Sequence, residues 1–417
     1  MILCIGNGLI VNPQTGLQAI GDLWVVDGKI ACIKTEQGIE GTIPVQEGNH
    51  SSMERMIDAT GKLVTPGLID LHVHFREPGF EYKEDIESGC NAAARGGFTT
   101  VCPMPNTVPV IDNPALVEYI KEKADKGCGV NVLPVGAITE GQQGYCLAEL
   151  DGMAKVGVCA FSEDGKSVMD AELMREAMIK ASAMNLPILD HAEDVNMPGS
   201  MISEELIVAR DILLASETGC RLHLCHISTK GSLEIIRNAK KQGIPVTAET
   251  APHYFTLSKS DVKGEGNKKM NPPLRGRSHI IAIKKALADG TLDAIATDHA
   301  PHSSDEKEVR FDQALNGVIG LETSFPISYM ALVQDGTISL MELIALMSSK
   351  PAAILGIEKG DLSIGKPADI AIFDLEYPYE IKADEFASKS RNCPFIGRKV
   401  YGKTLYTIVD GNVIYSI

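Results

Sequence analysis

The sequence predicts an α/β protein, a (β/α)8 TIM-like barrel with a small β-sandwich domain formed by both chain ends. Two observations lead to this prediction. Through the middle of the chain, apolar strand-like runs alternate with segments of helical periodicity, as in parallel strands joined by crossover helices. Both ends instead contain short β-like pieces broken by turn residues. We therefore assign residues 1–55 and 361–417 to the small β domain and residues 56–360 to the barrel.

Each chain end contains a dipeptide that is typical of tight β-hairpin turns. Asp27-Gly28 and Asp410-Gly411 both separate short apolar runs, and this residue pair tolerates the positive φ angles that such turns require. Strands are expected around them at residues 2–5, 8–11, 22–27, 29–34, 369–375, 405–409 and 413–415.

The central region supplies eight expected strands. They cover residues 68–74, 99–103, 131–138, 156–161, 187–191, 221–227, 244–249 and 292–297. Helical periods lie between them at residues 87–95, 114–126, 171–184, 232–242 and 279–289. Eight strand–helix units over about 300 residues fit a closed barrel. A doubly wound open sheet is the alternative, although no Gly-x-Gly-x-x-Gly follows the first strand, which counts against a dinucleotide-binding version.

Composition narrows the functional classes. The chain has 417 residues, 44% hydrophobic and 23% charged, and a formal net charge of −16, which disfavours nucleic acid and anionic membranes as partners. No segment approaches the length of a membrane span, and no signal peptide is visible, so we expect a cytoplasmic protein. The 10 cysteines contain no Cys-x-x-Cys pair, and we expect them to be small buried residues rather than a disulfide framework.

The first barrel strand ends in two histidines that could bind one metal ion. His72 and His74 are two residues apart, so their rings face the same side of a strand, and imidazole is a common ligand of Zn²⁺. Arg76 follows and could bind an anionic substrate. Taken alone, two ordinary buried histidines and a surface ion pair of Arg76 are the more common interpretation.

The ends of other strands strengthen the metal hypothesis. Acidic and imidazole side chains follow the fourth, fifth, sixth and eighth strands, at Glu163, Asp164, His191, His226 and Asp298. In a barrel these ends converge on one mouth. A two-metal hydrolytic site needs a bridging carboxylate, for which Asp164 and Glu163 both qualify by position. His191 and His226 would bind the second ion, and Asp298 could bind the first and exchange a proton with water.

The remaining histidines favour other interpretations. His223 is expected to face away from His226, and His50 and His279 are expected to be structural or exposed. His253 could line the mouth, and His299 could orient its neighbours rather than bind metal.

Several motifs resemble those of one enzyme family. Residues 66–79, which include His72, His74 and Arg76, resemble the opening signature of the dihydroorotases in the amidohydrolase superfamily. Residues 104–107, 190–193, 226–229, 271–275, 296–302 and 365–369 resemble that family in the same order. Because position 164 is acidic rather than lysine, the chain is similar to the class I bacterial dihydroorotases.

This resemblance implies roles for individual residues. It implies two zinc ions per chain, the first bound by His72, His74, Asp164 and Asp298 and the second by Asp164, His191 and His226. Asp298 would be the general acid/base. The residues that match substrate-binding positions are His74, Arg76, Asn106, Asn271, His302, Asn316 and Gly317, the last two through their backbone.

The implied activity is the reversible cyclisation of N-carbamoyl-L-aspartate to L-dihydroorotate in pyrimidine biosynthesis. One alternative is another cyclic amidase, a hydantoinase or allantoinase, but these generally use a bridging lysine. Another is a non-catalytic scaffold of aspartate transcarbamoylase, but such proteins typically lose metal ligands. A homodimer and a complex with aspartate transcarbamoylase are both left open. The segment from His191 to His226 is shorter than expected for class I, and residues 303–310 are expected to form a mobile lid.

Overall fold

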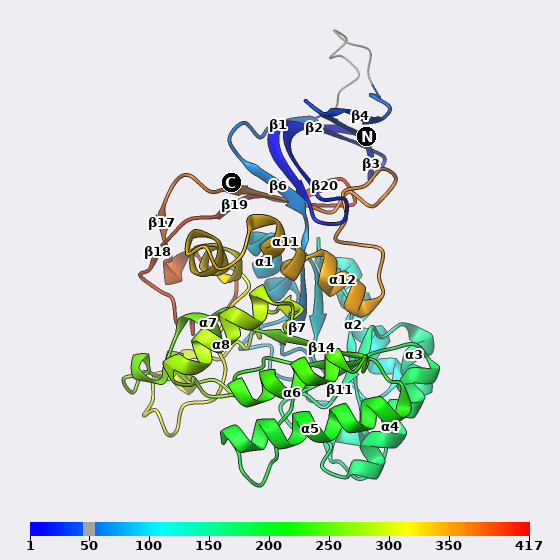
Figure 1. The fold of residues 1–417 in the computed structure, drawn as a ribbon, viewed down its shortest axis with the longest axis vertical. Helices are drawn as coiled ribbons and strands as arrows, with labels where there is room; N and C mark the ends of the chain where they lie inside the picture. Colours follow the sequence, from blue (N-terminus) through cyan, green and yellow to red (C-terminus); the bar gives the residue numbers. More distant parts are fainter. Residues whose placement is uncertain (45–54) are drawn as a thin grey trace.

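Parallel strands form the centre of the molecule. The computed structural model describes residues 1–44 and 55–417 and contains two groups of hydrogen-bonded parallel strands (Figure 1). One group consists of β7 (Leu68–Val73), β8 (Phe98–Pro103) and β9 (Asn131–Val132). The other runs through β10 (Val135–Ala137), β11 (Ala160–Ser162), β12 (Ile188–Asp190), β13 (Leu222–Leu224), β14 (Val246–Thr250) and β15 (Ala294–Ile295).

Two junctions close these groups into a barrel. β9 and β10 together occupy the single strand predicted at 131–138, which is interrupted next to Pro134 because proline has no amide proton for the ladder. At the other junction, the backbone N–H of His74 donates to the carbonyl of His299 at 2.8 Å, and Val73 forms a parallel bridge with His299. The prediction of a (β/α)8 barrel is confirmed.

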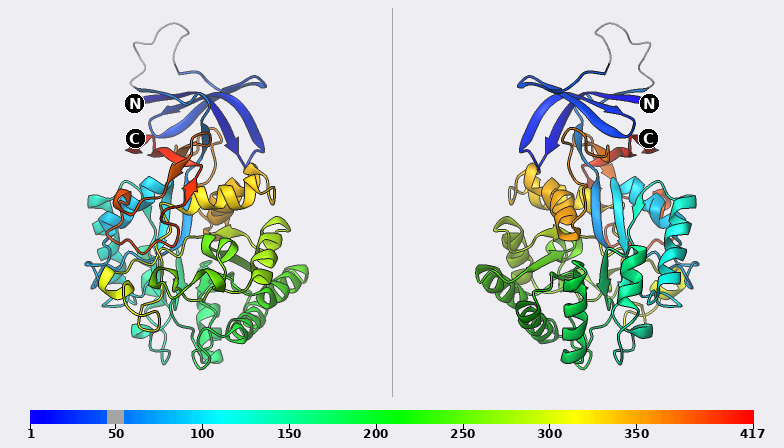
Figure 2. Two further views of the ribbon diagram at one scale, coloured as in Figure 1. Left: turned by 90° about the vertical axis from the view of Figure 1, so that its left-hand side faces the viewer. Right: turned by 90° about the vertical axis from the view of Figure 1, so that its right-hand side faces the viewer.

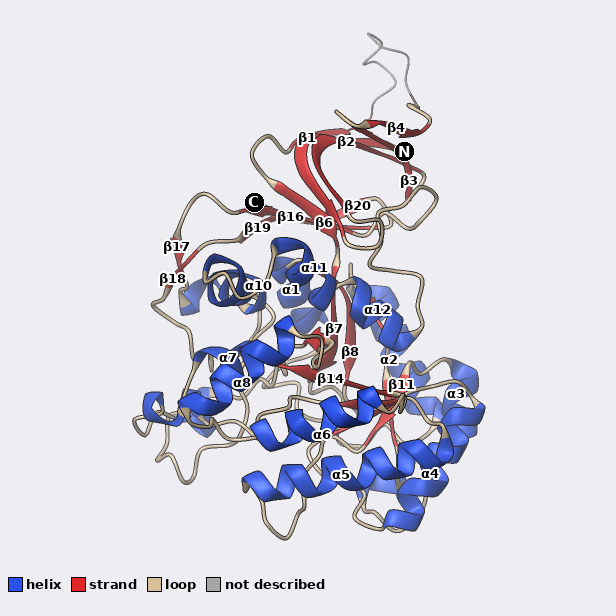
Figure 3. Ribbon diagram, viewed as in Figure 1, coloured by secondary structure: helices blue, strands red, loops and turns tan. Residues whose placement is uncertain are grey.

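Helices surround the barrel strands (Figure 3). The five helices expected from periodicity all form, as α1 (Ile86–Gly96), α2 (Pro114–Gly127), α4 (Ala171–Ala183), α6 (Lys230–Lys241) and α8 (Arg277–Ala288). Further helices are α3 (Leu150–Val156), α5 (Met201–Thr218), α7 (Pro252–Thr256), α9 (Ser304–Lys307), α10 (Ser324–Ser328), α11 (Leu340–Met347) and α12 (Ser349–Leu355). Short 3-10 turns are η2 (Glu140–Gln142), η3 (Lys259–Asp261), η4 (Gly266–Lys268) and η6 (Ala383–Glu385), and η5 (Tyr329–Gln334) is a π-helix. No helix in the described ranges is long and apolar enough to cross a membrane.

The strand expected at 156–161 begins later than predicted. Val156 is the last residue of α3, and Gly157 ends that helix in the left-handed region at φ 94°, a conformation that glycine adopts without steric cost. β11 then starts at Ala160. Val156 belongs to the helix and residues 157–159 to the connection, and the prediction missed this because a short apolar run does not distinguish a helix end from a strand.

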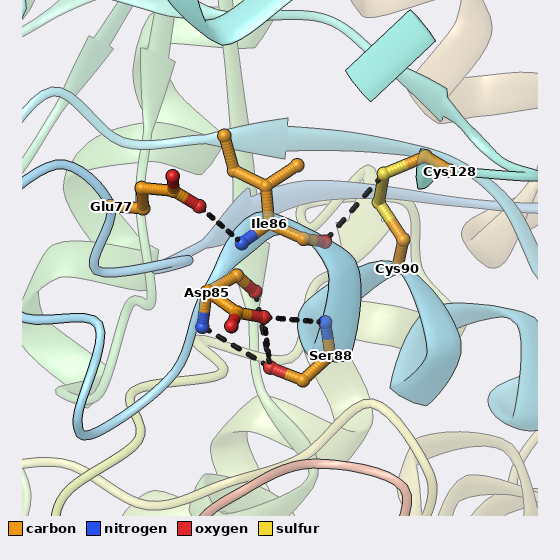
Figure 4. Close-up of a disulfide and its surroundings, with 6 residues drawn as sticks. All are labelled: Glu77, Asp85, Ile86, Ser88, Cys90 and Cys128. Atoms are coloured by element: carbon orange, nitrogen blue, oxygen red, sulfur yellow. Dashed lines mark hydrogen bonds between the residues drawn. A yellow bond between two sulfur atoms is a disulfide. The ribbon is translucent and has the colours of Figure 1, made fainter. Parts of the chain in front are cut away.

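One pair of cysteines departs from the expectation that the cysteines are small buried residues rather than a disulfide framework. Cys90 on α1 and Cys128 at the end of α2 form a disulfide, with their Cα atoms 5.5 Å apart (Figure 4). The two residues are 38 positions apart, so only the packing of α1 against α2 brings them together. The other cysteines are free thiols, and all of these except Cys146 are buried.

The chain ends share one sheet beside the barrel (Figure 2). Its order is β20-β19-β16-β6-β1-β2-β3-β4, with β5 paired to β1. The strands are β1 (Ile2–Asn12), β2 (Leu17–Val26), β3 (Lys29–Thr35), β4 (Gly38–Gly41), β5 (Arg55–Asp58), β6 (Leu63–Pro66), β16 (Ile370–Asp374), β19 (Lys403–Val409) and β20 (Asn412–Ser416), and β17 (Tyr379–Glu380) pairs separately with β18 (Lys399–Val400).

This sheet encloses its own apolar core. Leu3, Ile10 and Leu23 from the N-terminal strands pack with Ile370 and Ile408 from the C-terminal strands, so the sheet buries one face against itself as a sandwich does. The N-terminal contribution extends to Pro66, beyond the boundary proposed at residue 55. The division into two domains stays a prediction.

Both predicted hairpin turns form, and they contact each other. Asp27 and Gly28 have φ angles of 46° and 80°, and Asp410 and Gly411 have φ angles of 46° and 77°. A Cβ atom at Gly28 would lie 2.9 Å from the carbonyl oxygen of Asp410. Glycine therefore permits the close approach of two turns from opposite ends of the chain.

Candidate metal centre and substrate cavity

A cavity of about 200 Å³ lies at the carboxyl ends of the barrel strands. It is lined by His74, Arg76, Asn106, Asp164, Gly165, His191, His226, Asn271, Asp298, Ala300, His302, Asn316 and Gly317. Every site residue predicted from the sequence is in this set except His72, which is only 1% exposed. A larger hollow of about 640 Å³ shares Gly165, Asn271 and Asn316 with this cavity.

Asp164 lies at the centre of four histidines. Its carboxylate oxygens are between 3.1 and 3.9 Å from ring nitrogens of His72, His74, His191 and His226. Asp298 also approaches the first pair, with Oδ1 3.7 Å from Nε2 of His72 and 3.4 Å from Nε2 of His74. The structure therefore brings together all six residues predicted as metal ligands.

The nitrogen and oxygen atoms of this cluster are better arranged to bind divalent cations than to form hydrogen bonds with one another. Nδ1 of His191 lies 2.9 Å from Nε2 of His226. Because an unprotonated ring nitrogen carries a lone pair, two such nitrogens at this distance need a proton or a cation between them. Both ring nitrogens of buried His72 have no hydrogen-bond partner among the described residues. Nitrogen and carboxylate donors around one point are the ligand set of zinc and related ions. Two groups that could bind an ion, His72–His74–Asp298 and His72–Asp164–His226, occur here.

Backbone turns aim several of these side chains into the cavity. Arg76, His226 and Asp298 have φ angles of 61°, 38° and 49°, which are uncommon for residues other than glycine. Each follows a barrel strand, where a left-handed residue reverses the chain. Three such residues at one cavity are typical of a functional site, where strained conformations concentrate.

The electrostatics keep the two aspartates ionised. Burial by itself would raise the pKa of Asp298, but His74 and the neighbouring His72 lower that pKa to about 2. Burial also opposes the ionisation of Asp164, yet the pKa of Asp164 is lowered because His72, His191 and His226 surround it. Ionised carboxylates are the form that binds a cation and that accepts a proton.

Glu163 points away from this cluster, although its position in the sequence also qualified it as the bridge. Its carboxylate accepts the backbone N–H of Thr139 at 3.0 Å and also binds the hydroxyl of Thr139. Only Asp164 reaches the histidines, because the contacts of Glu163 with Thr139 hold its side chain away from them.

Two asparagines connect the cluster to its surroundings. The side-chain N–H of Asn106 donates to Oδ2 of Asp164 at 2.9 Å, and its oxygen lies 2.9 Å from Nδ1 of His74. Asn271 donates to Glu193 at 2.8 Å and lies 3.3 Å from Nε2 of His191. Both asparagines therefore orient predicted ligands as well as line the cavity.

Another wall of the cavity is cationic. Nε of Arg76 donates to the carbonyl of Pro301 at 3.2 Å, and its Nη2 is 3.5 Å from Nε2 of His302. No carboxylate in the described part of the chain lies within ion-pair distance of Arg76, so its guanidinium can take an anionic ligand. Burial and the charges of Arg76 and Lys83 lower the pKa of His302 to about 3, and this neutral ring donates through Nε2 to the carbonyl of Asn316 at 2.7 Å.

The segment predicted as a lid is anchored in this structure. Glu306 on α9 forms an ion pair with Lys83 at 2.9 Å and accepts the hydroxyl of Tyr82 at 2.9 Å. Buried Lys307 donates to the carbonyls of Lys269, Leu315 and Gly317 at 3.0, 2.8 and 2.7 Å. These contacts connect residues 303–310 to the loop that carries Asn316 and Gly317. Opening of the segment stays a prediction.

The other histidines lie outside the cavity. His299 lies 3.4 Å from Glu84 and accepts the backbone N–H of Gly320, and His279 accepts the backbone N–H of Lys230. His253 is buried beside Tyr254. His50 lies outside the described residues. His223 was expected to face away from His226 because both were assigned to one strand. That reasoning was wrong, because β13 ends at Leu224 and the alternation of side chains along a strand does not extend to His226.

Sequence reasoning missed several residues that support this site. Glu193, Lys83, Glu306 and Lys307 contact predicted site residues or their loops, and no motif marks them. Glu249, whose carboxylate lies 3.5 Å from Nδ1 of His72, was missed as well, although a carboxylate inside a predicted barrel strand is itself an unusual signal.

Comparisons with known proteins agree with this arrangement. A model of the amidohydrolase family matches residues 63–414. The chain is 46% identical over 435 residues to a protein named dihydroorotase from Geotalea daltonii, with 100% of both chains covered. It is 43% identical to a protein of the same name from Ruminiclostridium cellulolyticum, with 99% of this chain and 98% of the other covered.

Solved structures with the same fold include cyclic-amide hydrolases. The L-hydantoinase (dihydropyrimidinase) from Arthrobacter aurescens matches with a TM-score of 0.89 and 27% identity, covering 99% of this chain and 96% of the other. A dihydropyrimidinase from Brevibacillus agri has a TM-score of 0.86 at 22% identity, with coverage of 100% and 95%. The second likeness concerns the fold alone.

Proposed function

This chain belongs to the amidohydrolase family, and we propose that it is a dihydroorotase, which interconverts N-carbamoyl-L-aspartate and L-dihydroorotate in pyrimidine biosynthesis. The observation that carries the proposal is one cavity with a carboxylate among four histidines on one wall and Arg76 on the other. The full-length similarity to proteins named dihydroorotase supports the same function.

We infer that the cavity binds two zinc ions. His72, His74, Asp164 and Asp298 would bind the first, and Asp164, His191 and His226 the second. When bound, such ions activate water and polarise an amide carbonyl at neutral pH. The ring-nitrogen and carboxylate distances around Asp164 support this assignment.

The side chains around the ions then transfer the proton and bind the substrate. Asp298 accepts a proton from the attacking water and passes it to the ring nitrogen when the amide C–N bond breaks; cyclisation reverses these steps. Arg76 binds the carboxylate that both substrates keep, since a guanidinium pairs with a carboxylate through two parallel hydrogen bonds. Asn106, Asn271 and His302 border the substrate, with the backbone of Asn316 and Gly317. His74 lines the same space.

The alternatives are less well supported. A hydantoinase or allantoinase generally has a lysine where this chain has Asp164, and relatives at 43–46% identity over the full chain are named dihydroorotase. A non-catalytic scaffold would not need all six predicted ligands to meet in one cavity. We therefore propose a catalytic chain in the cytoplasm rather than a scaffold, whether it acts alone, as a homodimer or in a complex with aspartate transcarbamoylase.

Assays of the purified, zinc-loaded chain test this proposal. We expect hydrolysis of dihydroorotate and cyclisation of N-carbamoyl-L-aspartate, both abolished by a chelator and restored by zinc. Hydantoin and allantoin are matched control substrates that lack the carboxylate for Arg76. Faster turnover of either control than of dihydroorotate would reject the assignment.

A further inference from the structure

Below the proposed metal centre, a buried carboxylate faces the one predicted ligand that does not line the cavity. Oε1 of Glu249 on β14 lies 3.5 Å from Nδ1 of His72. Glu249 is fully buried and His72 is 1% exposed. Neither Glu249 oxygen has a hydrogen-bond partner among the described residues. A buried carboxylate without donors is costly, so its neighbours must supply protons.

A second histidine lies on the other side of the same carboxylate. Nε2 of His223 on β13 is 3.1 Å from Oε2 of Glu249, and Nδ1 of His223 is 2.8 Å from the hydroxyl of Thr247. Thr247 and Glu249 are two apart on β14 and therefore face the same side, toward the barrel interior. The result is a buried polar row of Thr247, His223, Glu249 and His72.

We propose that Glu249 is a positioning residue that accepts the Nδ1–H of His72, so that Nε2 of His72 presents its lone pair to the metal, and that His223 fixes Glu249 in place. This inference rests on the proposed function and extends its site beyond the cavity. A metal-binding histidine commonly donates its second ring N–H to a carboxylate, which sets the tautomer and the ring orientation.

Cys225 is the third group near this carboxylate, and it suggests a rival explanation. Ligand atoms of His72, Cys225 and Glu249 all lie within 4.8 Å of one another, so they could themselves hold an ion. However, Nε2 of His72 faces Asp164, which leaves Nδ1 as the protonated nitrogen and removes it as a ligand.

Metal affinity tests the inference independently of turnover. We expect Glu249→Gln to weaken the affinity for one of the two ions by about 10- to 100-fold, measured by competition with a chromophoric chelator. The absorption spectrum of the cobalt-substituted protein should shift as well, because the ligand geometry changes. Glu322→Gln is the matched control: Glu322 is a buried glutamate that pairs with Arg95 at 3.0 Å away from the cavity, and its replacement should leave metal affinity unchanged even if stability falls.

A second variant tests whether the polar row acts on metal binding or only stabilises the fold. His223→Gln should weaken the same ion less than Glu249→Gln does, and adding it to Glu249→Gln should change affinity by no more than about twofold, because His223 acts through Glu249. If Glu249→Gln does not fold, the His223→Gln result decides alone. Unchanged affinity in folded Glu249→Gln or, failing that, in His223→Gln would overturn the inference. So would a Cys225→Ala variant that loses an ion. A wild-type chain that binds no divalent ion would instead reject the proposed function.

Discussion

The two walls of the cavity are built from different kinds of structure. On the metal side, His72, Asp164 and His191 are in strands of the barrel or directly follow them, and all are buried. On the anion side, His302 and Asn316 belong to loops, held by contacts such as those of Lys307. The metal wall is thus part of the rigid scaffold, whereas the anion wall depends on contacts between loops. We expect substitutions on the metal side to affect chemistry and those on the anion side to affect substrate binding.

The largest effect on turnover is expected for Asp298→Asn. Asparagine keeps the shape and an oxygen ligand but cannot accept a proton, so kcat should fall by about 10²- to 10⁴-fold. Steady-state kinetics and elemental analysis of the same sample measure turnover and bound metal. Asp151→Asn is the control, because Asp151 on α3 is exposed and pairs with Lys180 outside the cavity. Near-normal kcat with both ions bound would show that another group moves the proton.

Arg76→Met is expected to have an intermediate effect. It removes a charge-assisted pair with the substrate carboxylate, worth about 1.5–3 kcal/mol, so kcat/KM should fall at least about tenfold. Most of the loss should appear as a higher KM, with metal content unchanged. Arg175→Met provides the control, since Arg175 on α4 does not line the cavity and pairs with Glu172 and Glu217. An unchanged KM in Arg76→Met would remove Arg76 from the anion wall.

Glu306→Gln should have a smaller effect. It weakens the anchor to Lys83 and Tyr82, and a partly exposed ion pair contributes up to about 1 kcal/mol. We expect KM to rise by about two- to fivefold while kcat stays the same. A fall in kcat with no change in KM would mean that residues 303–310 affect chemistry rather than substrate retention.

The same variant predicts a pH dependence of stability. Burial opposes ionisation, but Lys83 and Tyr82 lower the pKa of Glu306 from 4.5 to about 2. A carboxylate whose pKa is lower in the folded than in the unfolded protein stabilises the folded state at pH values above its unfolded pKa. This contribution is lost as the pH falls toward the folded pKa. The difference in Tm between wild type and Glu306→Gln should therefore be constant above about pH 4.5 and narrow below it. A difference that widens in acid would contradict this.

The contrast between the walls also explains what the sequence could predict. Histidine and aspartate at the ends of apolar runs identify the metal wall, because barrel topology alone brings these ends together. The motif resemblance supplied Arg76 and His302, but not their support from Lys83, Glu306 and Lys307, because contacts between distant loops leave no periodic pattern. The Cys90–Cys128 disulfide escaped prediction for the same reason, since it depends on how two helices pack.

The most direct test of the account is the metal content of three proteins loaded with zinc and purified in the same way. Elemental analysis should find two ions per chain in the wild type and in Glu163→Ala, whose side chain binds Thr139 instead of the histidines. Asp164→Ala should retain at most one ion and lose activity, because no other carboxylate lies between the two histidine pairs in the described structure. Two ions in Asp164→Ala, or full activity in a metal-free wild type, would contradict the proposed centre.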